Sequence, residues 1–183
     1  MPETGGAPVA RRLFLALWPD ATLRSVAAGR VAVLVPRDRG RPQRPDQLHV
    51  TLVFLGPVAE ERLDDVRAVA AGVSGTPFTV VLDRLEHWRK PRVLCLAASD
   101  VPAPLNSVVE QLRAALADRR LPTESRPYRP HLTLARKVGR FEGPTEVEPL
   151  LWRADSITLV ESRTDRTGSL YEPLASWALA ATR

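Results

Sequence analysis

The chain has 183 residues, and its 26 Lys and Arg against 21 Asp and Glu give a net charge of +5. Its 44% hydrophobic and 26% charged residues are typical of a globular protein and too apolar for a disordered one. The length fits one domain, or two small lobes that share a core. A single cysteine, Cys95, excludes an internal disulfide. No apolar run approaches the roughly 20 residues that span a bilayer, and residues 1–10 lack the apolar core of a signal peptide, so we expect a cytoplasmic protein without a membrane anchor.

The excess positive charge lies in one part of the chain. Residues 1–44 contain eight arginines and three acidic residues, whereas the charges of residues 45–183 cancel. Only Lys90 and Lys137 are lysines, and the other basic residues are arginines, which form two-pronged hydrogen bonds to phosphate. A polyanionic ligand is one explanation of this composition, and a GC-rich genome that replaces lysine codons is another.

The first half of the chain predicts alternating strands and helices. The predicted elements are a strand at 13–17, a helix at 21–34, an exposed loop at 36–45, a strand at 48–55 and a helix at 60–71. Asp20 is suited to cap the first helix because its carboxylate can accept a free backbone N–H. Apolar residues alternate with others along 48–55, which is typical of a strand, and we expect Gly56 and Pro57 to end it.

The second half predicts a similar mixture. We expect strands at 78–82 and 93–96 joined across 86–92, a helix at 104–116, loops at 121–130 and 139–149, and strands at 132–135, 157–161 and 176–180. In the connection, His87 is interpreted as a surface turn residue. Cys95 lies in an apolar strand and is expected to pack there rather than to do redox chemistry.

A short repeat indicates two related halves. His49-Val50-Thr51-Leu52 recurs as His131-Leu132-Thr133-Leu134, and each copy follows a loop rich in Arg and Pro and a strand-then-helix pattern. This predicts an α+β fold with two pseudo-symmetric lobes, each a small antiparallel sheet with helices on one face. We expect residues 1–10 to be a flexible lead-in and residues 11–183 to form a single bilobal domain. The two arginine-rich loops would then form two basic lips around one cleft.

The two His-x-Thr pairs indicate phosphoester chemistry. Residues i and i+2 of a strand point to the same side, so each lobe presents one imidazole and one hydroxyl. One neutral and one charged histidine can act as general base and general acid, and hydroxyls can donate to phosphate oxygens. Two polar sheet faces exposed to water are the structural alternative. A zinc site is disfavoured because the chain has only 3 histidines and neither pair supplies three ligands.

These motifs resemble those of the 2H phosphoesterase superfamily, and within it the RNA 2′,3′-cyclic phosphodiesterase, or 2′-5′ RNA ligase, family. The flanking segments that share the resemblance are RLFLAL at 12–17, LHVTLVFLG at 48–56, RPYRPHLTLAR at 126–136 and SLYEPLASWAL at 169–179. The resemblance implies a bilobal fold that hydrolyses a 2′,3′-cyclic phosphate at an RNA end to a 2′-phosphomonoester, with no metal or other cofactor. It implies that His49 is the proton donor and His131 the proton acceptor, while Thr51 and Thr133 hold the phosphate.

Other residues and functions stay open at this stage. Arg126 and Tyr128 are candidates for substrate binding, while Phe14 either stacks on a base or belongs to the core. Trp88 and Arg92 lie in a hairpin that can border the cleft. The expected partners are RNA ends or nucleotides that carry a 2′,3′-cyclic phosphate, with no obligatory protein partner, so we expect a monomer. The alternatives are 2′-5′ RNA ligation, a phosphodiesterase for small cyclic nucleotides or ADP-ribose cyclic phosphate, and an RNA-binding module without catalysis.

Overall fold

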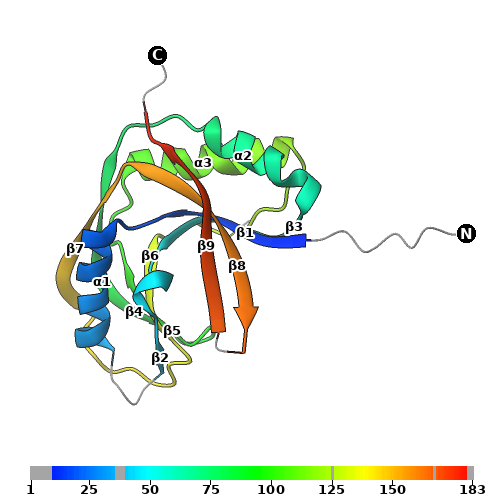
Figure 1. Cartoon of the computed structure of the whole chain (residues 1–183). Helices are drawn as coiled ribbons and strands as arrows, with labels where there is room; N and C mark the ends of the chain where they lie inside the picture. Colours follow the sequence, from blue (N-terminus) through cyan, green and yellow to red (C-terminus); the bar gives the residue numbers. More distant parts are fainter. Residues whose placement is uncertain (1–9, 36–39, 125, 167, 181–183) are drawn as a thin grey trace, which may run out of the picture.

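The structure is a computed structural model that describes residues 10–35, 40–124, 126–166 and 168–180 (Figure 1). Residues 1–9, nearly all of the predicted lead-in, lie outside the described residues, and Ala10 begins the first strand. The elements in chain order are β1 (Ala10–Leu17), α1 (Ala21–Leu34), β2 (Arg41–Pro42), η1 (Pro45–Gln47), β3 (Val50–Ala59), η2 (Glu60–Arg62), α2 (Leu63–Ala71), β4 (Phe78–Trp88), β5 (Val93–Ala97), α3 (Ala103–Asp118), β6 (His131–Arg136), β7 (Glu146–Ala154), β8 (Ser156–Asp165) and β9 (Gly168–Ala178). None of the helices in this described part is long and apolar enough to cross a membrane.

The strands form two antiparallel half-sheets that meet at one point. Their order is β7-β4-β5-β6-β3-β1-β8-β9, with β2 added to β6. We call β3, β1, β8 and β9 lobe 1, and β7, β4, β5 and β6 lobe 2. A single residue pair, Val50 opposite Leu132, joins β3 to β6. These two residues are the centres of the two His-x-Thr pairs, so the predicted two-lobed α+β fold is confirmed and its pseudo-two-fold axis passes between the motifs.

The helices form where the sequence predicts them, and their buried apolar residues pack in the same core as those of the sheet. The carboxylate of Asp20 accepts a hydrogen bond from the N–H of Leu23 at 2.7 Å and so caps α1. Helix α2 lies beside α3 at the top of Figure 1, while α1 lies apart from them. α3 buries the predicted apolar face in one core that extends through both lobes; these residues are Leu105, Val108, Val109, Leu112 and Leu116.

One predicted strand end is wrong, because β3 continues past Gly56 and Pro57 to Ala59. Gly56 adopts a positive φ of 75°, which a residue without a Cβ adopts readily, where the pairing of β3 with β1 shifts by one residue. Beyond Val50 the structure pairs β3 with β1 on one side only. A strand with one open edge can accept a proline, because its missing N–H need not cost a ladder bond.

The predicted loop at 139–149 is also wrong in its second part, since β7 begins at Glu146 and pairs with β4. Strand β4 runs to Trp88, so His87 is not a surface turn residue. It is half-buried within the strand, and its Nε2 lies 3.2 Å from the carbonyl oxygen of Val138. The last two predicted strands are present but longer, because β8 and β9 pair along nearly their whole length.

Candidate active site

The two His-x-Thr pairs lie on either side of the seam between the lobes. Val50 and Leu132, which face each other there, are fully buried on the core side. Successive residues of a strand point to opposite faces, so the residues before and after Val50 and Leu132 point away from the core. These four residues are partly exposed: His49, Thr51, His131 and Thr133. The charge of His131 also influences the ionisation of His49. The structure therefore brings together the four predicted groups in one place.

Each imidazole is held by a backbone carbonyl two residues before it. The Nδ1 of His49 lies 2.8 Å from the carbonyl oxygen of Gln47, and the Nδ1 of His131 lies 2.8 Å from that of Arg129. A carbonyl oxygen can only accept, so Nδ1 carries the hydrogen in both rings. The Nε2 atoms are therefore left to exchange a proton with a ligand in the cleft.

Burial lowers the pKa of both histidines. The pKa of His49 falls to about 4, because desolvation outweighs the bond to Gln47 and the charge of Arg136 adds to the effect. Burial also lowers the pKa of His131, with Arg136 and Arg129 contributing in the same direction. Burial therefore favours the neutral form of both rings in the free protein. A phosphate between them would favour the charged form and raise both pKa values.

Aromatic rings surround His49 in lobe 1. Its ring centroid lies 4.8 Å from that of Phe14, 5.7 Å from that of Trp18 in a stacked arrangement, and 5.0 Å from that of Tyr171, edge-on. Phe14 is buried, as the core interpretation predicts, but in a small cluster separate from the main core. The base-stacking alternative for Phe14 is disfavoured, because the ring is only 3% exposed and packs against the histidine.

A charged network surrounds His131 in lobe 2. The ring of Trp88 lies 4.4 Å from that of His131, and its Nε1 donates to a carboxylate oxygen of Glu86 at 2.6 Å. Arg129 donates to both oxygens of the same carboxylate, at 2.8 and 3.0 Å, and its guanidinium lies 5.2 Å from the Trp88 ring centroid. The sequence placed Trp88 near the cleft but gave no role to Glu86.

Arg136 is a candidate residue that the sequence reasoning missed. Simple alternation along β6 would turn it towards the core with Leu132 and Leu134. However, Thr133 pairs with one residue of β5 and Ala135 with the next, so Leu134 is an extra residue, a β-bulge. The bulge returns Arg136 to the face of Thr133, where its positive charge lowers the pKa of both histidines.

Lobe 1 has the same irregularity at the equivalent position. Thr51 and Val53 pair with adjacent residues of β1, so Leu52 is extra in β3. The residue that corresponds to Arg136 is therefore Phe54, which carries no charge. The guanidinium of Arg12 lies 4.6 Å from the centroid of its ring. Both lobes thus have a β-bulge after the threonine, but the residue that the bulge turns to the face of the threonine is Arg136 in lobe 2 and Phe54 in lobe 1.

The two further predicted binding residues lie outside the cluster of four. The Arg126 side chain is 80% exposed and pairs with Glu124 at 2.6 Å. Tyr128 is half-buried, burial raises its pKa, and its hydroxyl has no hydrogen-bond partner among the described residues. The Tyr128 side chain lines a cavity of about 840 Å³ together with Trp88 and Arg129. Tyr128 thus shares this cavity with two residues that contact His131, whereas the contacts of Arg126 in the described part of the chain are with Glu124 and Arg113.

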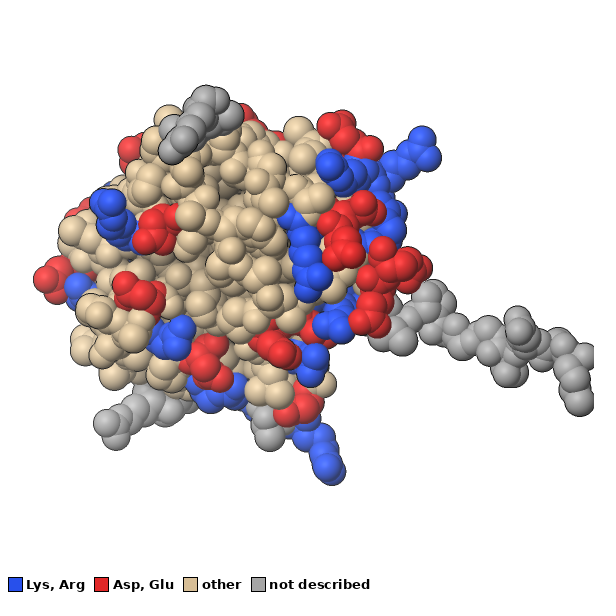
Figure 2. All heavy atoms as spheres, turned by 45° about the horizontal axis from the view of Figure 1, so that its top comes forward, with Lys and Arg blue, Asp and Glu red and all other residues tan. Residues whose placement is uncertain are grey.

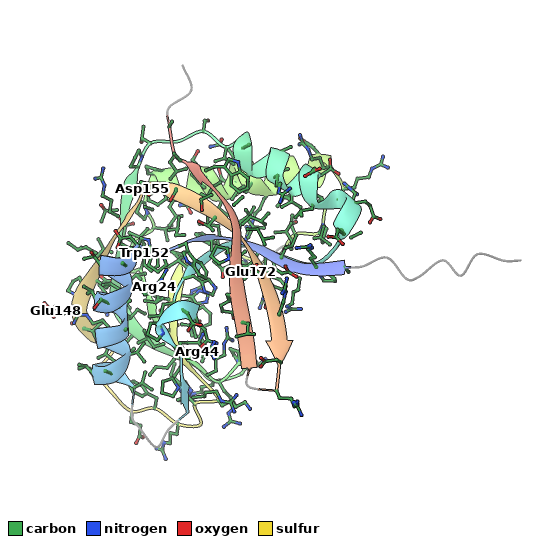
Figure 3. The ribbon with its side chains drawn as sticks, viewed as in Figure 1. Arg24, Arg44, Glu148, Trp152, Asp155 and Glu172 are labelled. Carbon is green, nitrogen blue, oxygen red and sulfur yellow. The ribbon has the colours of Figure 1, made fainter. Side chains whose placement is uncertain are left out.

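The two arginine-rich loops that precede His49 and His131, predicted to form basic lips around the cleft, do so only in part. Arg37 and Arg39 lie outside the described residues. Arg44 is neutralised by Asp46 at 3.1 Å beside η1 (Figure 3). The second loop contains Arg119, Arg120, Arg126 and Arg129, and among the described contacts only Arg129 touches a site histidine, through its backbone carbonyl. Figure 2 shows basic and acidic side chains intermixed around an uncharged area, rather than one basic patch.

No group of three His, Cys, Asp or Glu side chains in the described ranges is placed to hold a metal ion. Cys95 is fully buried beside Thr133 and Glu86 in the sheet, as its packing interpretation predicts, and burial raises its pKa to about 12. The groups available for chemistry at the seam are therefore imidazoles, hydroxyls and a guanidinium.

Two lobes that each present one imidazole and one hydroxyl at a shared seam define a two-histidine (2H) phosphoesterase. A family model described as the 2′-5′ RNA ligase superfamily matches residues 18–166, and the chain belongs to that superfamily. Among its relatives, the RNA 2′,3′-cyclic phosphodiesterase of Escherichia coli is 32% identical over 172 residues, covering 92% of this chain and 97% of the relative. The protein of that name from Thermus thermophilus is 29% identical and covers 92% of this chain and 90% of the relative.

Solved structures agree with this assignment. The crystal structure of E. coli LigT complexed with 3′-AMP matches with a TM-score of 0.85 and 31% identity, over 93% of this chain and 99% of that one. The MHV ns2 PDE domain matches with a TM-score of 0.55 at 14% identity, over 84% of this chain and 99% of that one, which shows a shared fold alone.

Proposed function

We propose that the protein hydrolyses 2′,3′-cyclic phosphates at RNA ends to 2′-phosphomonoesters. The observation that carries the proposal is the convergence of two His-x-Thr pairs at one seam, where Nδ1 of each ring is bonded to a carbonyl and neither Nε2 has a hydrogen-bond partner among the described residues. Two relatives that cover nearly the whole chain are named RNA 2′,3′-cyclic phosphodiesterases, which supports the same reaction. An RNA-binding module would need arginines and aromatic rings but not two imidazoles with this shared tautomer.

The proton transfers follow from the two free Nε2 atoms. His131 accepts a proton from water as the water oxygen bonds to phosphorus. The bond from phosphorus to the 3′ oxygen breaks, and His49, which has taken up a second proton on Nε2 because the bound phosphate favours its charged form, donates that proton to the departing oxygen. The backbone holds both rings alike, so this allocation of roles rests on the family resemblance. The phosphate ester stays on the 2′ oxygen, and the two histidines together return to their starting charge after exchanging a proton with solvent.

The remaining groups of the cleft stabilise the phosphate. Thr51 and Thr133 donate hydrogen bonds to the non-bridging oxygens, where negative charge grows in the transition state. Arg136 adds a positive charge on the same face. Charge-assisted hydrogen bonds to phosphate are stronger than neutral ones, so Arg136 would contribute more than either hydroxyl.

The finer parts of the proposal concern the substrate and the state of the protein. The cavity of about 840 Å³ is lined by Trp88 and Arg129, which contact His131, and space of this size near the seam favours an RNA end over a small cyclic nucleotide. Tyr128 would contact the strand in this cavity and Arg126 would contact it further out. We propose that the protein acts as a monomer in the cytoplasm, without an obligatory protein partner and without a metal or other cofactor.

The test compares an RNA oligonucleotide that ends in a 2′,3′-cyclic phosphate with a cyclic mononucleotide. We expect the oligonucleotide to have the higher kcat/KM and to give only the 2′-phosphate, with activity that persists in EDTA. His49→Ala and His131→Ala should each lower kcat/KM by roughly 10²- to 10⁴-fold. Asp64→Asn, which changes a carboxylate on α2 that is 90% exposed, is the control. High activity in both histidine variants would contradict the proposal, and an RNA with a free 5′ hydroxyl in the assay measures the reverse, joining reaction.

A further inference from the structure

Glu86 is a carboxylate in lobe 2 that the proposed reaction does not use. On neighbouring strands it lies opposite Cys95, which in turn lies opposite Thr133, so its side chain is on the same face of the sheet as the second His-x-Thr pair. Its carboxylate accepts one hydrogen bond from the indole N–H of Trp88 at 2.6 Å and two from Arg129 at 2.8 and 3.0 Å. Glu86 is therefore the point at which these two side chains are tied together.

Both of these partners contact His131. Arg129 supplies the carbonyl oxygen that holds Nδ1 at 2.8 Å, and Trp88 packs its ring against the imidazole at 4.4 Å. One partner fixes which nitrogen carries the hydrogen, and the other limits rotation of the ring. Glu86 does not bond to His131 in the described contacts, so any effect of its hydrogen bonds on the imidazole passes through Arg129 and Trp88.

Lobe 1 provides a comparison within the same molecule. The position that corresponds to Glu86 there is Thr158, since Thr51 lies opposite Ala16 and Ala16 opposite Thr158. Thr158 is bonded to Ser176 at 2.8 Å and not to the residues that hold His49. A carboxylate in the second lobe thus replaces a hydroxyl in the first.

The carbonyl that holds His49 is anchored without any charge. Gln47 is only 8% exposed, and its side-chain N–H donates to the carbonyl oxygen of Ser169 at 2.6 Å. Its side-chain oxygen accepts the backbone N–H of Arg44 at 3.0 Å. In both lobes the residue two before the histidine is therefore held by its side chain, by neutral hydrogen bonds in lobe 1 and by an ion pair in lobe 2.

We propose that Glu86 is a positioning residue that, through Trp88 and Arg129, holds His131 in the orientation and tautomer the reaction needs. The inference rests on the proposed function of the cleft. The charged and titratable groups around His131 are Arg129 before it, Arg136 after it on β6, His49 across the seam and Glu86 on β4, with the buried thiol of Cys95 on β5. Glu86 is the negatively charged member of this described set, so its removal leaves the cations around His131 uncompensated.

The test uses two substitutions of Glu86. Glu86→Gln keeps an oxygen that can accept the Trp88 N–H but loses the charge that pairs with Arg129, whereas Glu86→Ala loses both. We expect kcat to fall by roughly 10- to 100-fold in Glu86→Ala, with little change in KM, and less in Glu86→Gln. We also expect the limb of the pH profile that reports His131 to move to lower pH in both variants.

Nitrogen NMR of the imidazoles reads the tautomers without any substrate. Glu86→Ala should mix the two tautomers of His131 and leave His49 in its Nδ1–H form, which also reports that the fold of lobe 1 is intact. The matched control is Glu146→Gln, which removes an exposed carboxylate paired with Arg84 on the adjoining strand and should change neither kcat nor the spectrum.

An unchanged His131 tautomer with unchanged kcat and pH profile in Glu86→Ala would overturn the proposal. An effect confined to KM would also overturn it and would make Glu86 a substrate-binding residue. If the wild-type protein hydrolyses no cyclic phosphate, the proposed function fails, but the tautomer measurement still decides whether Glu86 holds His131.

Discussion

The two lobes hold their histidines by the same backbone geometry and in different chemical surroundings. In both, a carbonyl two residues earlier bonds Nδ1 and a bulge follows the threonine. His49 then packs among three aromatic rings, while His131 packs against one ring tied to Glu86 and Arg129. The backbone alone would make the two histidines interchangeable. Their side-chain neighbours are what distinguishes them.

The largest expected effect distinguishes the two histidines by the leaving group. A cyclic substrate in which sulfur replaces the departing 3′ oxygen needs no proton donor, because a thiolate is a far better leaving group than an alkoxide. We expect His49→Ala to regain most of the roughly 10²- to 10⁴-fold that it loses on the oxygen substrate. His131→Ala should stay impaired on both substrates. Steady-state rates on the two substrates measure this.

The same experiment can show that the two histidines have the opposite roles. Rescue of His131→Ala instead of His49→Ala would exchange the roles of acid and base. Rescue of neither variant would show that departure of the 3′ oxygen does not limit the rate. A double variant of both histidines is the control, since it should remain inactive on either substrate.

The next largest effect is expected from substitution of Arg136, compared with Phe54 at the equivalent position after the bulge of lobe 1. Arg136→Ala should lower kcat/KM by roughly 10- to 100-fold, which corresponds to the loss of one charge-assisted hydrogen bond worth about 1.5–3 kcal/mol. Phe54→Leu, at the equivalent position of lobe 1, should change it less than about threefold, because Phe54 offers the phosphate no charge or hydrogen bond. Equal losses in the two variants would show that Arg136 acts by packing, and thermal unfolding would detect it.

A smaller effect tests whether the two hydroxyls are equivalent. Thr51→Val and Thr133→Val keep the shape of the side chain and remove one neutral hydrogen bond each. We expect each to lower kcat/KM by roughly 3- to 10-fold, for a bond worth about 0.5–1.5 kcal/mol. A large difference between them would show that the phosphate lies closer to one lobe. Steady-state kinetics with the cyclic-phosphate oligonucleotide measures both.

The smallest effect is a displacement of the pH optimum. The base must be neutral, so the rate falls as pH drops through its pKa, and the acid must be charged, so the rate falls as pH rises through its pKa. Burial lowers both pKa values, that of His49 to about 4, so the bell-shaped profile of kcat/KM should be centred below pH 6.5. The profile of kcat should lie at higher pH, because bound phosphate favours imidazolium. A kcat/KM profile centred at or above pH 7 would contradict the effect of burial.

The sequence was sufficient to predict that each histidine shares a face with its own threonine, because this depends on local strand alternation, whereas the meeting of the two pairs depends on the pairing of Val50 with Leu132. His49 and Thr51, like His131 and Thr133, are two residues apart, and no distant contact is needed to put them on one face. Arg136 could not be found in this way. Its position depends on the bulge at Leu134, which forms only when β6 pairs with β5.

Local sequence patterns also do not predict which side chains of other strands contact the two histidines. Glu86 is brought beside Thr133 by the pairing of β5 with β6, and Tyr171 is brought against His49 by the pairing of β1 with β8, and both pairings join strands that are far apart along the chain. The pattern at 139–149, with its Gly and Pro, did not indicate a strand, and β7 is held in place by its pairing with β4. The sequence predicts a turn at His87, whereas β4 continues through this residue because its pairing with β5 extends to Trp88.

The pairing of β1 with β8 has a consequence for how the protein is made. The ribosome synthesises β1 long before its neighbour β8 and before β9, which brings Tyr171 against His49. Contacts of such high sequence separation form slowly. Until they do, the apolar edge of β1 needs protection from aggregation. A nascent chain can thus complete the aromatic shell of His49 only after Tyr171 in β9 has been synthesised.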